Sequence, residues 1–254
     1  MTPVSHPYLD RPTPIPFAHR GGAADGLENT AAAFRRAAGL GYRHFETDVH
    51  ATADGRLVAF HDATLDRVTD SRGRIFDLPW AEVRRARVAG TEPLPLFEEL
   101  LEEFPEARWN VDIKAAPALE PLVELIRRTD CWDRVCVGSF SEARVARAAR
   151  LAGPRLATSY GVKGVLGLRL RSYGIPFPVR PGAVCAQVPE TQSGIRVVDE
   201  RFIRMAHARG LQVHVWTVNE PDRMEALLDL GVDGIMTDQL EALRTVLTAR
   251  GVWH

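Results

Sequence analysis

The chain has 254 residues, of which 45% are apolar and 26% are charged. A chain of this length can bury a full core, and its polarity excludes a membrane-embedded helix bundle. The 32 Lys and Arg residues nearly balance the 33 Asp and Glu residues, which leaves a formal net charge of −1. No large basic surface is available for a nucleic acid or an anionic bilayer, so any phosphate recognition has to be local.

The cysteines and the N-terminal segment indicate the compartment. Three cysteines are an odd number without metal-like spacing, so we predict neither a disulfide framework nor a thiolate cluster. The first 16 residues contain five prolines. They do not show the positively charged segment followed by an apolar stretch that is typical of a signal peptide. We expect a cytoplasmic protein without stable membrane anchoring and without a nucleic-acid partner.

An amphipathic run, a glycine and a short apolar strand follow one another three times, in residues 31–49, 202–218 and 224–238. Repeated helix-to-strand units of this kind predict a parallel sheet, and about 250 residues is the usual size of a (β/α)₈ barrel. We therefore predict a somewhat irregular α/β TIM-type barrel that forms one domain over residues 1–254. The eight predicted strands are Pro16–His19, His44–Val49, Trp109–Ile113, Val135–Ser139, Leu156–Ser159, Ala183–Gln187, Val213–Thr217 and Gly234–Thr237.

A ninth apolar run, Leu57–His61, lies too close to the second strand to allow a crossover helix. It is predicted to fold back as an antiparallel hairpin arm. A two-residue turn at Asp54 and Gly55 would place His61 opposite Asp48. Residues 62–95 then form a small insertion within the domain, with one helical pattern at Trp80–Val88.

Residues 160–181 combine Gly and Pro with an apolar, arginine-rich piece. Three interpretations are open for this segment: a lid, a loop that touches a bilayer, or an ordinary crossover with a short helix. The ordinary crossover is the simplest of the three.

Polar side chains gather at the ends of three predicted strands, in His19-Arg20, Glu46-x-Asp48 and Asp112-x-Lys114. Residues two apart on a strand share a face, and the bulky apolar residues between them suit the outer face of a barrel. The acidic side chains should therefore point into the barrel.

Three converging carboxylates repel one another and are costly to desolvate unless a cation lies between them. All-oxygen ligation by Glu46, Asp48 and Asp112 favours one divalent cation, Mg²⁺ or Ca²⁺. The simpler alternative is that one or two of these acids pair with Arg20 or Lys114. Lys114 is one of only two lysines in the chain, and a compact ammonium at that position suits a phosphate oxygen or a carboxylate pair.

Two histidines are predicted to lie on either side of this metal site. His19 ends the first strand and His61 ends the hairpin arm. Because an imidazole titrates near neutral pH, one can accept a proton from a nucleophile while the other donates to a leaving oxygen. Hydrogen-bonded structural histidines are the alternative.

Six blocks of the sequence resemble, in order, the glycerophosphodiester phosphodiesterases. The blocks are HRGGAADGLENTAAAF, FETDV, ADGRLVAFHDATLDRVT, NVDIK, VHVWTVNE and GVDGIMTD. Their order is specific, although each block alone is weak. The third acidic position, usually Glu in this family, is Asp112 here, and the insertion after His61 is shorter than in many relatives.

The resemblance implies a role for each of eight residues. His19 and His61 would be the acid–base pair, and Glu46, Asp48 and Asp112 would bind the divalent ion. Arg20 and Lys114 would hold the phosphate, and Trp216 would form an aromatic wall beside the glycerol.

Residues beside these blocks carry smaller expectations. Asn29 or Thr30 is a plausible N-cap for a helix that begins near Ala31, and Glu28 is a candidate to orient a site arginine. Asp238 is expected to cap the last helix, and Phe140 is a further candidate for the pocket.

The predicted activity is hydrolysis of glycerophosphodiesters, small molecules, to glycerol 3-phosphate and an alcohol in lipid and glycerol metabolism. One alternative is phospholipase D-like hydrolysis of lysophospholipids at the same site, supported only by the apolar stretch within residues 160–181. The other is a non-catalytic barrel, which substitution of His19 would test. The oligomeric state is open.

Overall fold

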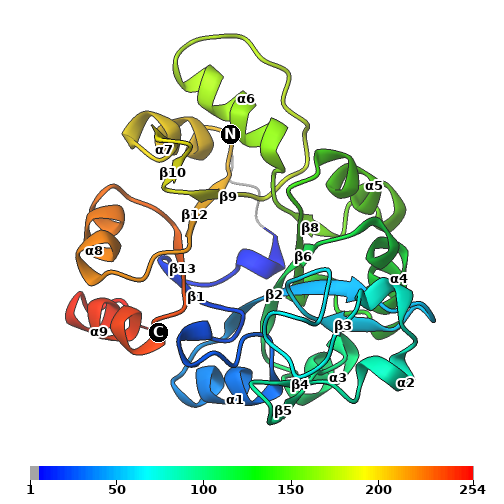
Figure 1. Ribbon diagram of the computed structural model, residues 1–254. Coiled ribbons are helices and arrows are strands. Elements are labelled where there is room, and N and C mark those ends of the chain that lie inside the picture. Colours follow the sequence, from blue (N-terminus) through cyan, green and yellow to red (C-terminus); the bar gives the residue numbers. More distant parts are fainter. Residues whose placement is uncertain (1–5, 254) are drawn as a thin grey trace.

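The computed structural model describes residues 6–253, so the predicted domain span of 1–254 extends beyond the described residues at both ends. Figure 1 looks along a barrel with strands at its centre and helices around them. The strands pair in the order β8-β7-β6-β2-β1-β13-β12-β9, with every neighbouring pair parallel. Among residues 6–253, an isolated bridge between Ser159 and Cys185 and the backbone hydrogen bonds beside it connect the two ends of this order, so the barrel is nearly closed.

The eight parallel strands correspond one to one with the predicted strands, with small differences at their ends. They are β1 (Ile15–His19), β2 (His44–Ala51), β6 (Arg108–Ile113), β7 (Val135–Gly138), β8 (Ala157–Thr158), β9 (Cys185–Pro189), β12 (Gln212–Trp216) and β13 (Gly234–Thr237). The predicted (β/α)₈ fold is therefore confirmed.

The main helices follow these strands and cover the outside of the sheet (Figure 1). They are α1 (Ala31–Gly39), α3 (Phe97–Glu103), α4 (Leu119–Thr129), α5 (Glu142–Ala152), α6 (Val162–Ser172), α7 (Glu200–His207), α8 (Pro221–Asp229) and α9 (Leu240–Ala249). Thr30 caps α1 by accepting from the backbone N–H of Ala33. Within residues 6–253, no helix is long and apolar enough to cross a bilayer.

The largest core cluster lies between the sheet and the helices, with Trp109 fully buried. The rings of Phe34, Phe45 and Phe97 meet Trp109 edge to face at 4.9–5.5 Å. Such pairs add to the stabilisation from apolar burial, and truncating a buried Trp to Ala costs about 3–5 kcal/mol. This cluster holds β2 and β6, two strands that carry predicted site residues.

The hairpin arm exists, but its predicted register is wrong by one residue. β3 (Leu57–Ala59) runs antiparallel to β2, with Val49 opposite Ala59. The turn contains three residues rather than two, because Thr52 N–H donates to the carbonyl of Arg56 and Gly55 adopts a φ of +78°. A three-residue hairpin loop with a left-handed glycine is a common geometry.

The shifted register moves the end of the arm. The residue opposite Asp48 is Phe60, whose N–H donates to the Asp48 carbonyl, so the prediction that His61 lies there is wrong. His61 follows just after the end of the ladder.

The segment 62–95 folds around its own small cluster of buried residues, which includes Leu65 and Ile75. The predicted helix at Trp80–Val88 is only one turn long, α2 (Trp80–Val83). The chain then forms the two-residue strands β4 (Arg87–Val88) and β5 (Glu92–Pro93). The helical pattern is wrong after Val83 because Arg87 N–H pairs with Asp70 of the same segment instead of continuing the helix.

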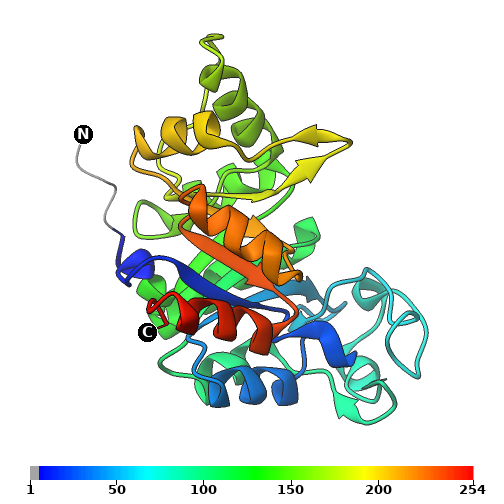
Figure 2. The same ribbon diagram turned by 90° about the vertical axis from the view of Figure 1, so that its left-hand side faces the viewer.

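Residues 160–181 contain the crossover helix α6, with Leu168 fully buried and Phe177 against Gly167. This matches the crossover interpretation of the segment. A second small hairpin, β10 (Thr191–Gln192) and β11 (Ile195–Arg196), follows β9. Figure 2 shows this hairpin and the segment 62–95 projecting from the same end of the barrel.

Candidate active site

The predicted site residues lie toward the carboxyl ends of barrel strands, except His61, which follows the hairpin strand β3. β6, β2, β1, β13 and β12 are consecutive neighbours in the barrel. His19 on β1 is level with Glu46 on β2, and Asp48 on β2 is level with Asp112 on β6. The carboxyl ends of barrel strands are where such enzymes place their chemistry.

The loop after β1 turns sharply, and its glycines allow this. Gly21 and Gly22 have φ values of +81° and +92°, and a Cβ at Gly22 would lie 2.6 Å from Leu240. Arg20 also has a positive φ, of 52°, and its backbone N–H donates to Glu46 Oε2 at 3.1 Å. A residue with a side chain rarely takes this conformation, which indicates that the loop is shaped to aim the Arg20 backbone and side chain at the site.

Two cationic side chains hold Asp48, whose own side chain is almost completely buried. Lys114 Nζ lies 2.8 Å from Asp48 Oδ1, and Arg20 Nε lies 3.2 Å from Asp48 Oδ2. Burial raises the pKa of Asp48, but the Lys114 and Arg20 charges outweigh it, so the pKa lies below the ordinary value. Asp48 therefore stays ionised in the interior of the barrel mouth.

Asn29 fixes Asp48 from a third direction. Its amide donates to Asp48 Oδ2 at 3.0 Å, and its carbonyl accepts from Thr47 Oγ1 at 2.7 Å. Asn29 is thus a site residue rather than an N-cap, which Thr30 provides. Its position beside the predicted cap gave no sign of this role in the sequence.

Lys114 bridges two carboxylates, because Nζ also lies 2.7 Å from Asp112 Oδ2. Burial lowers the pKa of Lys114, but Asp48 and Asp112 outweigh burial and raise it. The second oxygen, Asp112 Oδ1, is buried and has no hydrogen-bond partner among the described residues. An unpaired buried carboxylate oxygen is costly, which marks this position as one that a cation would stabilise.

Glu46 is also buried close to another carboxylate. Burial, and then the nearby Asp48 carboxylate, raise the pKa of Glu46 to about 7. In residues 6–253 no three His, Cys, Asp or Glu side chains surround one point closely enough to hold a metal, since Lys114 lies between Asp48 and Asp112. The all-oxygen donor set, the unpaired Asp112 Oδ1 and the raised pKa of Glu46 nevertheless suit a hard divalent cation.

His19 is held by a carboxylate from the far end of the chain. Its Nδ1 donates to Asp238 Oδ1 at 2.7 Å, and its Nε2 lies 3.8 Å from Glu46 Oε2. Burial lowers the pKa of His19, but Glu46 and the Asp238 hydrogen bond outweigh it and raise the pKa above the ordinary value. Asn219 supports Asp238 by donating to Oδ2 and accepting from the Asp238 N–H.

The expectation that Asp238 caps α9 is therefore wrong. The cap position of that helix is Gln239, without a side-chain hydrogen bond. The Asp238 carboxylate points to His19 instead. Its place directly after β13, at the carboxyl end of a barrel strand, was the signal that could have identified it.

His61 has a different support. Its Nδ1 donates to Asp62 Oδ1 at 2.6 Å, and its side chain is 32% exposed. Arg67 donates to Asp62 and to Glu28. Glu28 also accepts from Arg20 Nη1 at 3.3 Å, so the expectation that Glu28 orients a site arginine fits the structure.

Aromatic side chains stand beside these groups. Trp216 at the end of β12 meets Phe140 edge to face, with ring centroids 5.7 Å apart. Lys114 Nζ lies 5.7 Å from the centroid of Phe140, whose side chain is 56% exposed. Trp216 and Phe140 therefore form an apolar wall next to the cationic end of the site.

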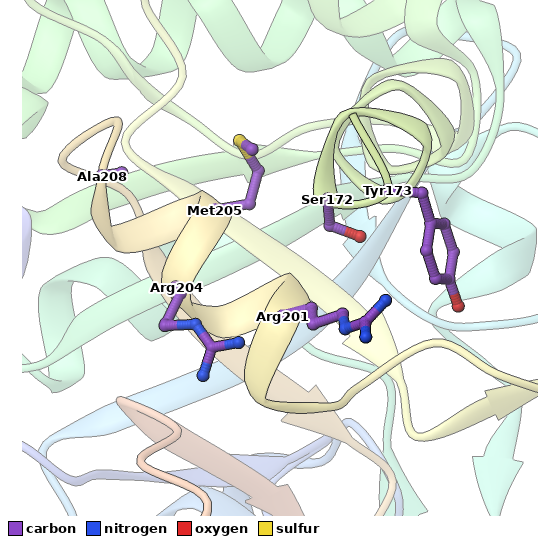
Figure 3. A pocket seen from close by; sticks show the side chains of 6 residues that line it. All are labelled: Ser172, Tyr173, Arg201, Arg204, Met205 and Ala208. Carbon is purple, nitrogen blue, oxygen red and sulfur yellow. The ribbon is translucent and has the colours of Figure 1, made fainter. Parts of the chain in front are cut away.

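A cavity of about 400 Å³ lies apart from these groups, between the end of α6 and α7. Figure 3 shows its lining residues, which are Ser172, Tyr173, Arg201, Arg204, Met205 and Ala208. None of them is a predicted site residue. Arg201 lies 6.0 Å from the Tyr173 ring and Arg204 pairs with Glu200, so no acid–base pair converges on this cavity.

A (β/α)₈ barrel whose carboxyl end gathers two imidazoles, three carboxylates and two cations suits an enzyme that hydrolyses phosphate esters. The comparisons with known proteins name the group. The model of the glycerophosphoryl diester phosphodiesterase family matches residues 19–242. The chain belongs to this family and is a phosphoric diester hydrolase.

Individual relatives agree with this assignment. A Mycobacterium tuberculosis protein named "probable glycerophosphodiester phosphodiesterase 2" is 43% identical over 94% of this chain and 92% of its own length. Human lysophospholipase D GDPD1 is 31% identical over 91% of this chain and 85% of its own length. An Oleispira antarctica phosphodiesterase, solved with the product sn-glycerol-3-phosphate, has the same fold with a TM-score of 0.77, 22% identity and coverage of 93% and 97%.

Proposed function

We propose that the chain hydrolyses glycerophosphodiesters to glycerol 3-phosphate and an alcohol, with one divalent cation and with His19 and His61 as the acid–base pair. The observation that carries the proposal is the arrangement of two carboxylate-held imidazoles beside a cluster of carboxylates and cations. The names of the relatives support the substrate class. A cytoplasmic location and a role in lipid and glycerol metabolism belong to the same proposal.

The side chains divide the work of the reaction. Arg20 and Lys114 neutralise the charge on the non-bridging phosphate oxygens. Both cationic groups stand at the carboxylate cluster, in contact with Asp48. One imidazole takes the proton of the attacking hydroxyl or water, and the other gives a proton to the departing oxygen. Trp216 lies against the apolar face of the glycerol. Asp238 and Asp62 hold the two imidazoles by Nδ1, which leaves each Nε2 for proton transfer.

Glu46, Asp48 and Asp112 are the residues that would hold the cation. When bound, a Mg²⁺ or Ca²⁺ ion supplies Lewis-acid stabilisation of the charge on the phosphate. The Lys114 ammonium contacts both Asp48 and Asp112, the two carboxylates that it would share with such a cation.

The test uses glycerophosphocholine, chelation and two matched variants. His19→Asn should lower kcat/KM at least about 100-fold, the usual minimum for losing a general acid or base. His207→Asn is the control, because His207 also pairs with an aspartate, Asp233, but stands outside the site at 43% exposure. EDTA should abolish the activity, and Mg²⁺ or Ca²⁺ should restore it. Full activity after thorough chelation, or equal activity of the two variants, would contradict the proposal.

Lysophospholipid hydrolysis is the second candidate function. Phe140 beside Trp216 is 56% exposed, and Ile195 on the β10–β11 hairpin is 67% exposed. Apolar side chains exposed at this end of the barrel suit an acyl chain. Phe140→Ser should then reduce turnover of lysophosphatidylcholine while turnover of glycerophosphocholine stays within about twofold. A preference for the lysolipid in the unmodified protein would replace the first substrate choice.

A further inference from the structure

Arg67, in the segment 62–95, lies between two carboxylates of the site. Its Nε donates to Asp62 Oδ2. Its two terminal nitrogens donate to the two oxygens of Glu28, at 3.1 Å and 2.6 Å. One guanidinium group therefore joins a residue next to His61 to a residue of the loop that follows β1.

Each of these carboxylates holds a group with a proposed role in the reaction. Asp62 accepts from His61 Nδ1 at 2.6 Å, and Glu28 accepts from Arg20 Nη1 at 3.3 Å. A path from the imidazole to the phosphate-binding guanidinium thus runs through Asp62, Arg67 and Glu28. Its longest step is the 3.3 Å hydrogen bond from Arg20 Nη1 to Glu28.

The geometry requires arginine at this position. A guanidinium presents five donors in a fixed planar fork, so one edge can serve Asp62 while the terminal nitrogens serve Glu28. Hydrogen bonds to Glu28 and Asp62 raise the pKa of Arg67, which keeps it charged. Its side chain is 48% exposed, and exposed ion pairs contribute little to stability. Its contribution is therefore to orientation.

The small core of the insertion sets the place of Arg67. Leu65, two residues earlier, is 1% exposed, and its N–H donates to the carbonyl of Gly73. Thr69 Oγ1 donates to the Leu65 carbonyl at 2.7 Å, two residues after Arg67. The turn that carries Arg67 is fixed on both sides.

We propose that Arg67 is a positioning residue that couples the orientation of His61 to that of Arg20. The inference rests on the proposed roles of those two residues. It gives the insertion a part in catalysis, because the insertion carries the guanidinium that fixes His61 and Arg20 relative to each other.

The first experiment compares Arg67→Met with Arg74→Met on glycerophosphocholine. Arg74 belongs to the same insertion, but its side chain is 66% exposed. Its ion pair is longer than those of Arg67, with 3.7 Å between Arg74 Nε and Asp77 Oδ2. Arg67→Met should lower kcat/KM about 10- to 100-fold, as losses of supporting contacts do, with a lower kcat and a higher KM. Arg74→Met should stay within about twofold of the unmodified protein. Arg67→Lys, which keeps the charge but not the fork, should recover only part of the loss.

The second experiment separates the two connections. Asp62→Asn should lower mainly kcat, and Glu28→Gln should raise mainly KM. Adding Arg67→Met to the variant that carries both changes should cost less than about threefold more, because its two partners are already lost. Methylguanidinium in the buffer should restore part of the activity of Arg67→Ala, which a merely structural loss would not allow.

The outcomes distinguish this inference from the proposed function. Full activity of His61→Asn removes both. If His61→Asn is inactive but Arg67→Met equals Arg74→Met, or its effect adds in full to the Asp62 and Glu28 changes, only the coupling is wrong. Circular dichroism of each variant confirms its fold, and Arg67→Lys together with methylguanidinium rescue of Arg67→Ala carries the test if Arg67→Met does not fold.

Discussion

The two histidine arms of the site are built in different ways. His19 ends a strand of the barrel, its side chain is 15% exposed, and its carboxylate partner lies 219 residues away, directly after another strand. His61 follows a hairpin strand, its side chain is 32% exposed, and its partner is the next residue in the chain. One imidazole is fixed by the barrel and the other by a loop and its insertion.

This difference suits a division of labour. A base that must meet the nucleophile in one geometry gains from a rigid, buried support. An acid that protonates the leaving alcohol must also release that alcohol to solvent. We therefore expect His19 to act as the base and the more exposed His61 to act as the acid.

Changing the leaving group of the substrate is the strongest test of these two roles, because it should produce the largest difference between His19 and His61. With glycerophosphocholine, His19→Asn and His61→Asn should each lose about 10³-fold in kcat. With a p-nitrophenyl diester, whose leaving group needs no proton, the loss for His61→Asn should shrink to about tenfold, while that for His19→Asn should not. Release of p-nitrophenolate measures both. The opposite pattern would exchange the two roles.

Replacing the carboxylate partner of His19 should lower kcat more than replacing the partner of His61. Asp238→Asn should lower kcat about 100-fold or more, since it removes the acceptor that fixes the buried imidazole. Because Asp238 raises the pKa of His19, the limb of the pH profile due to His19 should move to lower pH in this variant. Asp62→Asn should cost less, about tenfold, because solvent can replace part of its hydrogen bond. Equal losses would show that exposure does not separate the two arms.

Cation binding should depend on pH through Glu46, which lies beside His19 and not beside His61. Its pKa of about 7 in the metal-free protein means that binding a cation displaces a proton. Between pH 6 and pH 8 the ionised fraction rises about tenfold, so the affinity for Mg²⁺ should rise by about the same factor. Isothermal titration calorimetry at the two pH values measures this. Glu46→Gln should remove most of the dependence.

The smallest expected effects are on the free energy of unfolding, from one substitution near His19 and one in the insertion beside His61. Thr30→Ala removes the N-cap of α1 and should lower the free energy of unfolding by about 1 kcal/mol, with kcat unchanged. Thr69→Ala loosens the turn that carries Arg67 at a similar cost, but it should also lower kcat modestly. Urea unfolding and steady-state kinetics compare the two. A kcat loss in Thr30→Ala alone would show that the His19 side is the less rigid one.

The insertion and the hairpin turn before it show what local sequence patterns leave open. The run from Trp80 to Val88 has helical spacing, yet only one turn forms, because Asp70 recruits the backbone of Arg87. The turn at Asp54 and Gly55 suggested a two-residue loop, and one residue more changed which side chain stands opposite Asp48. Local propensity could not decide either case, because each segment also bonds to a distant one: Arg87 N–H to Asp70, and Ala53 N–H in the turn to the carbonyl of Leu78.

The sequence by itself determined the barrel and the residues at its strand ends. Alternating apolar segments and glycine-ended helices are local signals, and the motifs around His19, Glu46 and Asp112 are contiguous blocks. Only the tertiary structure decided the supports. Asp238 reaches His19, Asn29 reaches Asp48, and Arg67 reaches Glu28 because closure of the barrel and folding of the insertion bring distant backbone segments within hydrogen-bond distance. No pattern along the chain encodes such distances, because they arise from the closing of the sheet.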